Sequence, residues 1–97
     1  NFSKAFMAAS GVSLTHGFSH SYISERPLKQ AVLEKPVQHY FIVDNSKFGV
    51  KALLNMGPLC LADAICTNKL PEPRYVEFCL NHNISLLTPD TQNNGLG

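Results

Sequence analysis

Residues 39–49 read HYFIVDNSKFG, and this stretch decides the fold class. Residues 39–43 are aromatic or β-branched and stand between Pro36 and the turn-forming residues Asp44-Asn45-Ser46, a pattern typical of an interior β-strand. An apolar run at residues 4–9 predicts a buried strand that ends in a turn at Ser10-Gly11. Further strands are expected at residues 50–54, 64–67 and 84–87.

A first amphipathic helix is expected between residues 24 and 36. Ser24 is a good N-cap, and Pro27 falls in the first turn, where its missing N–H costs little. Apolar residues at helical spacing then form one face, and the helix ends near Pro36. This face consists of Leu28, Ala31 and Val32.

A second helix is expected over residues 73–82, with Asn83 as its stop. Val76, Cys79 and Leu80 form its apolar face by spacing. Residues 10–22 are rich in Ser, Thr, His and Gly and are expected to form a loop. The remaining connections are expected to be turns at 46–49 and 68–73 and a loop or single helical turn at 58–62.

Alternation of strands and helices predicts an α/β fold with layers around a largely parallel sheet. Two helices would cover the faces of that sheet thinly, so we expect the fold to be completed by residues N-terminal to this chain. The start at Asn1 has neither an initiator Met nor a signal peptide, which agrees with a piece of a longer protein. Residues 1–88 are then the C-terminal part of a domain, and residues 89–97 are expected to be a polar tail that is either disordered or foreign to the protein.

Composition narrows the function classes. The 97 residues are 44% hydrophobic and 15% charged, which excludes a disordered chain. Eight basic against seven acidic residues give a net charge of +1, without the basic excess of a stand-alone nucleic-acid-binding domain. No apolar run approaches the ~20 residues of a membrane span. Three cysteines without a Cys-x-x-Cys pair predict free thiols in the cytoplasm, with Cys66 and Cys79 as small core residues.

The chemistry is expected just after the strand at 39–43. Ligands of open α/β sheets bind at the carboxyl ends of strands, and there Asp44, Ser46 and Lys47 follow one another. The ammonium of Lys47 is a natural partner for a phosphate, Ser46 adds a hydroxyl donor, and Asp44 can accept from sugar hydroxyls. Phe48 would anchor the turn, and Gly49 permits a positive φ. The alternative is that Asp44 or Ser46 only caps a short helical turn and Lys47 is an ordinary solvated lysine.

Two further positions are candidates for the same site, each with a structural alternative. Ser10 and Gly11 could line the pocket through a hydroxyl and a backbone N–H, or could form a plain turn. Glu25 could bind a hydroxyl, or could complement the dipole of the first helix. His16 and His20 have the spacing of a metal pair, but no nearby Cys or carboxylate completes a site, so we expect exposed loop histidines and no metal.

The motif Asp44-x-Ser46-Lys47-Phe48-Gly49 after an apolar strand resembles the effector domains of the deoxyribose-operon repressor (DeoR) family. The resemblance extends over residues 4–88, although Pro36 interrupts a helix that is usually longer in the family. Further similar segments are KAFMAASGV at 4–12, His16-Gly17-Phe18-Ser19, Glu25 with Lys29-Gln30-Ala31, residues 62–67 and Leu70-Pro71.

The resemblance implies a fold similar to ribose-5-phosphate isomerase, in which the corresponding lysine helps to hold a phosphate. It implies a non-enzymatic sensor of a phosphorylated sugar, without a cofactor or a contact with a membrane, in a cytoplasmic and homo-oligomeric repressor of sugar or nucleoside catabolism. DNA would be bound only by an N-terminal helix-turn-helix absent here. The alternative is an isomerase fragment, but the acidic run of the isomerases is replaced here by Ala9-Ser10-Gly11-Val12, and the position of their base falls near Leu28.

Overall fold

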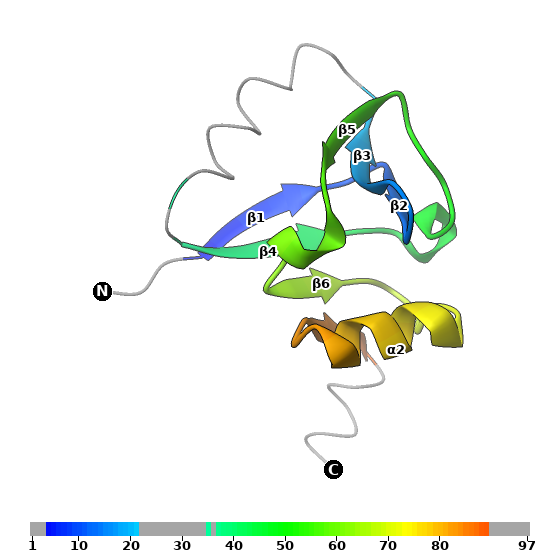
Figure 1. Cartoon of the computed structure of the whole chain (residues 1–97). Helices are drawn as coiled ribbons and strands as arrows, with labels where there is room; N and C mark the ends of the chain where they lie inside the picture. The colour runs from blue at the N-terminus through cyan, green and yellow to red at the C-terminus, as the bar shows by residue number, and fades with distance from the viewer. Residues whose placement is uncertain (1–3, 22–34, 36, 90–97) are drawn as a thin grey trace.

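The computed structural model describes residues 4–21, 35 and 37–89 (Figure 1). Its central feature is a four-stranded, fully parallel sheet in the order β1-β4-β6-β7. The register runs from Lys4↔Gln38 to Ala8↔Ile42 between the first two strands, and Ile42 is in turn opposite Cys66. The predicted α/β class and parallel sheet are confirmed. These strands are β1 (Lys4–Ala8), β4 (Gln38–Ile42), β6 (Ala64–Cys66) and β7 (Ser85–Leu87).

The two faces of this sheet differ. Met7, Phe41 and Ile65 point to one face and belong to the buried core. On the other face, the exposed fraction is 60% for Phe6 and 50% for Ile42. The prediction that the strand at 4–9 is buried is therefore wrong for most of its length, because β1 is an edge strand and only its inward residues are packed.

A second sheet of three antiparallel strands packs on the buried face, and this corrects the expected loop at 10–22. Its strands are β2 (Gly11–Ser13), β3 (Gly17–His20) and β5 (Leu54–Gly57), so the strand expected at 50–54 begins only at Leu54. Ser13 Oγ shapes the tip of the β2–β3 hairpin by accepting from the backbone N–H of Thr15 and His16 at 3.2 Å. Phe18 stacks on Phe41 with ring centroids 3.8 Å apart and joins the two sheets.

Helix α2 (Pro73–Asn81) follows β6 and returns the chain to the start of β7 (Figure 1). Its bounds agree with the prediction, and Asn83 adopts the left-handed φ of 57° that ends it. The prediction of the apolar face of α2 is partly wrong. Cys79 is buried as expected, but Tyr75 is the other buried residue, and Leu80 is 74% exposed.

Two single turns of 3-10 helix complete the connections. The turn η3 (Leu59–Leu61) precedes β6 and matches the expected single helical turn. The other, η2 (Asn45–Lys47), follows β4. The expected helix at 24–36 and nearly all of the tail at 89–97 lie outside the described residues. No helix in the described part of the chain is long and apolar enough to cross a membrane.

Candidate functional site

The parallel strands all end at one edge of the sheet, and a polar residue follows each of them within two positions; after β7 it is the buried Thr88. Ser10 comes after β1, Asp44 after β4, and Thr67-Asn68 after β6. Backbone hydrogen bonds extend the sheet past the strand ends, from Val43 N to Cys66 O at 2.9 Å and from Thr67 N to Leu87 O at 3.0 Å. The strands thus remain hydrogen-bonded to one another up to this edge. Open α/β sheets bind ligands at the carboxyl ends of their strands.

Asp44 caps the turn after β4. Its Oδ2 accepts from the backbone N–H of Ser46 at 2.9 Å and also from Ser46 Oγ. These hydrogen bonds, together with the nearby charge of Lys47, hold the pKa of the Asp44 carboxyl below its ordinary value. Asp44 is exposed and ionised at neutral pH. The capping alternative is thus present in the structure, and a carboxylate that caps a turn keeps lone pairs for a second partner.

Lys47 ends this turn with an exposed side chain. The Ser46 hydroxyl donates to Asp44, so it would have to rotate before it could donate to a ligand. The backbone N–H groups of Ser46, Lys47 and Phe48 are likewise taken by acceptors within the turn. Among these groups, the ammonium of Lys47 is the one available to a phosphate without rearrangement.

The residues after Lys47 fix the turn to the rest of the molecule. Phe48 packs edge-on against Tyr75, with ring centroids 5.1 Å apart, and forms a parallel bridge with Val12. Gly49 has a φ of 87°, and its N–H donates to Val12 O at 2.6 Å. The anchoring role expected of Phe48 and the positive φ expected of Gly49 are both found.

The strand β2, which follows Ser10, runs beside residues 48–52, where Val12 forms a bridge with Phe48. The backbone N–H of Ser10 is not free for a ligand, since it donates to Ser19 O at 2.9 Å. Gly11 is buried, and a Cβ there would lie 2.5 Å from both Ser19 Oγ and Val50 O. Close packing therefore explains the glycine.

A cavity of about 410 Å³ lies at this edge. It includes Asp44 but not Lys47, and it also includes two residues that the sequence did not single out, Thr67 and Asn68. Their position directly after an apolar strand was the available signal. The lining residues are Ile42, Val43, Asp44, Cys66, Thr67 and Asn68.

Asp44, Ser46 and Lys47 lie together in the turn after β4, and Ser10 follows β1 at the same edge of the sheet. Gly11 instead lies in β2 of the small sheet, packed against Ser19 and Val50, and Glu25 lies outside the described residues. The three cysteines are free, with Cys79 buried, Cys66 half-buried and Cys60 exposed. Burial raises the pKa of the Cys66 and Cys79 thiols, so both are poor nucleophiles.

The histidines need one correction. His20 is 1% exposed and part of β3, so the expectation of an exposed loop histidine is wrong for it. His16 is exposed at the hairpin tip, as expected. In residues 4–21, 35 and 37–89, no group of three or more His, Cys, Asp or Glu side chains is placed to hold a metal ion.

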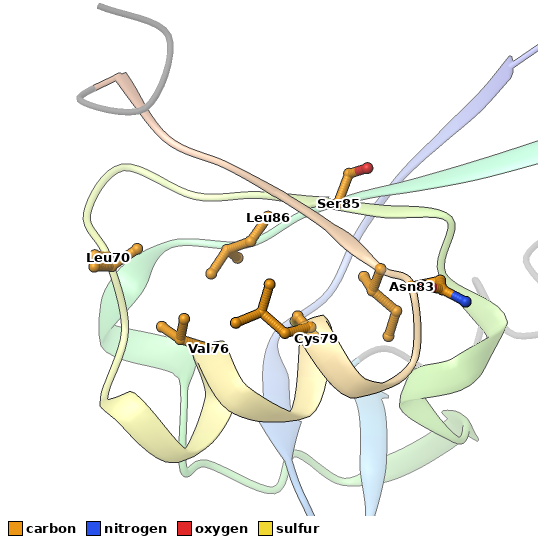
Figure 2. A pocket seen from close by; sticks show the side chains of 8 residues that line it. Leu70, Val76, Cys79, Asn83, Ser85 and Leu86 are labelled. Carbon is orange, nitrogen blue, oxygen red and sulfur yellow. The ribbon is translucent and has the colours of Figure 1, made fainter. Parts of the chain in front are cut away.

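A larger cavity, about 520 Å³, lies between α2 and β7 (Figure 2). Val76 and Cys79 line it from the helix and Leu86 from the strand, and Leu70 closes one end. None of its lining residues carries a charge, so it offers nothing to neutralise a phosphate. The smaller cavity beside Asp44 is the better candidate because the turn that begins after Asp44 carries the cation Lys47, although Lys47 does not line the cavity itself.

The chain is similar to one known protein family and to several transcriptional regulators. The model of the DeoR C-terminal sensor domain matches residues 1–69. The HTH-type transcriptional regulator IolR of Bacillus subtilis is 36% identical over 86 residues, which cover 89% of this chain and 34% of the relative. The deoxyribose operon repressor of Escherichia coli is 31% identical over 83 residues, with 86% and 33% covered.

The glycerol-3-phosphate regulon repressor of Escherichia coli is 34% identical over 58 residues, which cover 60% of this chain and 23% of that relative. The chain thus spans about a third of the length of the first two relatives. All three are named as regulators or repressors.

Proposed function

Because the chain belongs to the DeoR C-terminal sensor domain family, we propose that it binds a phosphorylated sugar at the carboxyl edge of its parallel sheet. Its relatives are named as transcriptional regulators or repressors, and the family is that of a sensor domain, which favours a sensor over an isomerase fragment. In the proposal, Lys47 and Ser46 contact the phosphate, while Asp44 and Glu25 accept from sugar hydroxyls. Ser10 and Gly11 border the site.

The exposed ammonium of Lys47 at the end of the central strand β4 carries this proposal. A phosphate dianion next to the ionised Asp44 would be repelled unless a cation stood between them or beside them. Lys47 already interacts with Asp44 and can supply that charge. The name of one relative refers to a sugar, deoxyribose, and that of another to a phosphate ester, glycerol 3-phosphate, and both are consistent with a small phosphorylated sugar as the class of effector.

In the full-length regulator, we propose that residues 1–88 form the C-terminal part of the effector domain and that residues 89–97 are a tail outside it. DNA would be bound by a helix-turn-helix elsewhere in a cytoplasmic homo-oligomer. Effector binding can change DNA affinity only if the effector binds the DNA-free form and the DNA-bound form with different affinities.

The test uses the full-length regulator. Ribose 5-phosphate, 2-deoxyribose 5-phosphate and glycerol 3-phosphate are titrated by calorimetry, with the unphosphorylated compounds as references. We expect Lys47→Ala to weaken binding of the phosphorylated probes by at least about tenfold, or about 1.4 kcal/mol, because a charged contact is lost. Unphosphorylated sugars should bind weakly to both proteins.

Lys35→Ala is the matched control, because Lys35 is an exposed lysine before the start of β4, at the opposite edge of the sheet. It should bind the probes as the wild type does. If no phosphorylated probe binds the wild-type protein, or if Lys47→Ala and Lys35→Ala bind it equally well, the proposed site is wrong.

A further inference from the structure

Asn68 occupies the position beside Asp44 on the neighbouring strand. Ile42 and Cys66 are registered partners in the parallel sheet, and Asp44 and Asn68 each come two residues later. The backbone N–H of Asn45 donates to Asn68 Oδ1 at 2.7 Å, which joins the ends of β4 and β6. Asn68 is thus tied to the turn that carries Lys47, and it lines the same cavity as Asp44.

This hydrogen bond determines which way the amide of Asn68 faces. A backbone N–H can only donate, so the atom that receives it must be the carbonyl oxygen of the side chain. The hydroxyl of Thr67 approaches the same oxygen at 3.5 Å. Nδ2 is then directed away from Asn45, and among the described residues it donates to no acceptor. Asn68 itself is exposed at the cavity.

We propose that Asn68 is a further ligand-binding residue, which holds the Asp44 turn through Oδ1 and donates from Nδ2 to an oxygen of the bound sugar phosphate. This inference rests on the proposed function. Asp44 is ionised and can only accept, whereas Nδ2 can only donate. A hydroxyl group satisfies both at once, because it donates to the carboxylate and accepts from the amide. The pair therefore selects a hydroxylated part of the sugar phosphate beside the phosphate held by Lys47.

Asn68→Asp separates the two roles of this side chain. The carboxylate keeps an acceptor for Asn45 N–H, so the turn is retained, but it has no donor and adds a negative charge beside Asp44. With ribose 5-phosphate as the probe, we expect at least a tenfold loss of affinity in the full-length regulator. The melting temperature without the probe should remain within a few degrees of the wild-type value.

Asn81→Asp is the matched control, because it adds the same charge on the last turn of α2, at the opposite edge of the sheet. It should bind ribose 5-phosphate as the wild type does. A second readout is the side-chain NH₂ resonance pair of Asn68 in a ¹⁵N-labelled protein, which should shift when ribose 5-phosphate is added. If Asn68 only holds the turn and does not contact the ligand, Asn68→Asp removes no hydrogen bond to the ligand.

A loss of affinity in both Asn68→Asp and Asn68→Ser, the second of which adds no charge, supports the inference, whereas a loss in Asn68→Asp alone comes from charge repulsion and overturns it. Wild-type affinity in Asn68→Asp overturns the inference and leaves the proposed function standing, since Lys47→Ala reports on that function separately. If Asn68→Asp fails to fold, Asn68→Ser decides, because its short side chain cannot reach both partners. Unchanged binding by Asn68→Ser would then overturn the inference, and a tenfold loss would support it. Absence of binding by the wild-type protein overturns the proposed function and this inference with it.

Discussion

Phe41 and Lys47 belong to the same short segment but lie in regions that are held together differently. Phe41 is fully buried between the two sheets, where it stacks on Phe18. The turn that contains Lys47 is exposed, and its backbone N–H groups at Ser46 and Asn45 donate to the side-chain oxygens of Asp44 and Asn68. Apolar burial contributes most of the stability of a domain, whereas exposed polar contacts contribute little. We therefore expect stability to depend on the packed region and ligand binding on the turn.

The largest effect on stability is expected from Phe18→Ala. The ring is fully buried and joins the small sheet to the central sheet, so its loss leaves a cavity between the layers. The free energy of unfolding should fall by about 3–5 kcal/mol. Urea denaturation of the full-length regulator measures it, and a loss below about 1 kcal/mol would show that the two sheets do not pack as described.

A smaller effect is expected from Gly17→Ala. Gly17 has a φ of 74°, and a Cβ there would overlap the backbone of Gly57 on β5. Strain and overlap together should lower the free energy of unfolding by about 2 kcal/mol or more.

Gly49→Ala is the control for Gly17→Ala. Gly49 has a similar φ of 87°, but a Cβ would meet nothing within 4 Å. It should cost only the backbone strain, about 1 kcal/mol. Equal losses in the two variants would contradict the close approach of β3 to β5, because only Gly17 faces a backbone neighbour.

The difference between the two regions also explains what the sequence could predict. The strand β4 and the turn after it were predictable because a local apolar run is followed at once by Asp44, Ser46 and Lys47, whose capping preferences act within a few residues. The bounds of α2 were predictable because Pro73 at its start and Asn83 after its end are also local signals. The signals that mark these elements, an apolar run and the residues that end it, are local in the sequence, and so is the position of the candidate site at a strand end.

The hairpin of β2 and β3 was not predictable in the same way. Ser19 and His20 are polar but fully buried, and β3 becomes a strand because it pairs with β5, far along the chain. Ser19 Oγ accepts from Ala52 N at 2.8 Å, a partner that the local sequence does not reveal. Tyr75 was missed on α2 because its burial depends on Phe48 and on a hydrogen bond to Val12 O. Asn68 was missed because its partner, the backbone N–H of Asn45, lies in the turn after a strand distant in sequence.

The smallest effect on stability is expected from Asp44→Asn, and it should depend on pH. The pKa of Asp44 is lower in the folded state than its ordinary value, mainly because Ser46 donates two hydrogen bonds to the carboxylate. A group whose pKa is lowered by folding stabilises the protein above its unfolded pKa, about 3.9, and loses that contribution as the pH falls through the folded value. The melting temperatures of wild type and Asp44→Asn should therefore differ at pH 6 and converge on acidification below about pH 4.

Glu77→Gln, which removes an exposed carboxylate from α2, accounts for the general effect of losing one negative charge. Melting curves between pH 6 and pH 2.5 compare the three proteins. Parallel curves for wild type and Asp44→Asn over this whole range would mean that the Asp44 carboxylate does not cap the turn in solution. Convergence in Asp44→Asn but not in Glu77→Gln would assign the pH dependence to the cap, and so to the same turn that presents Lys47 to the ligand.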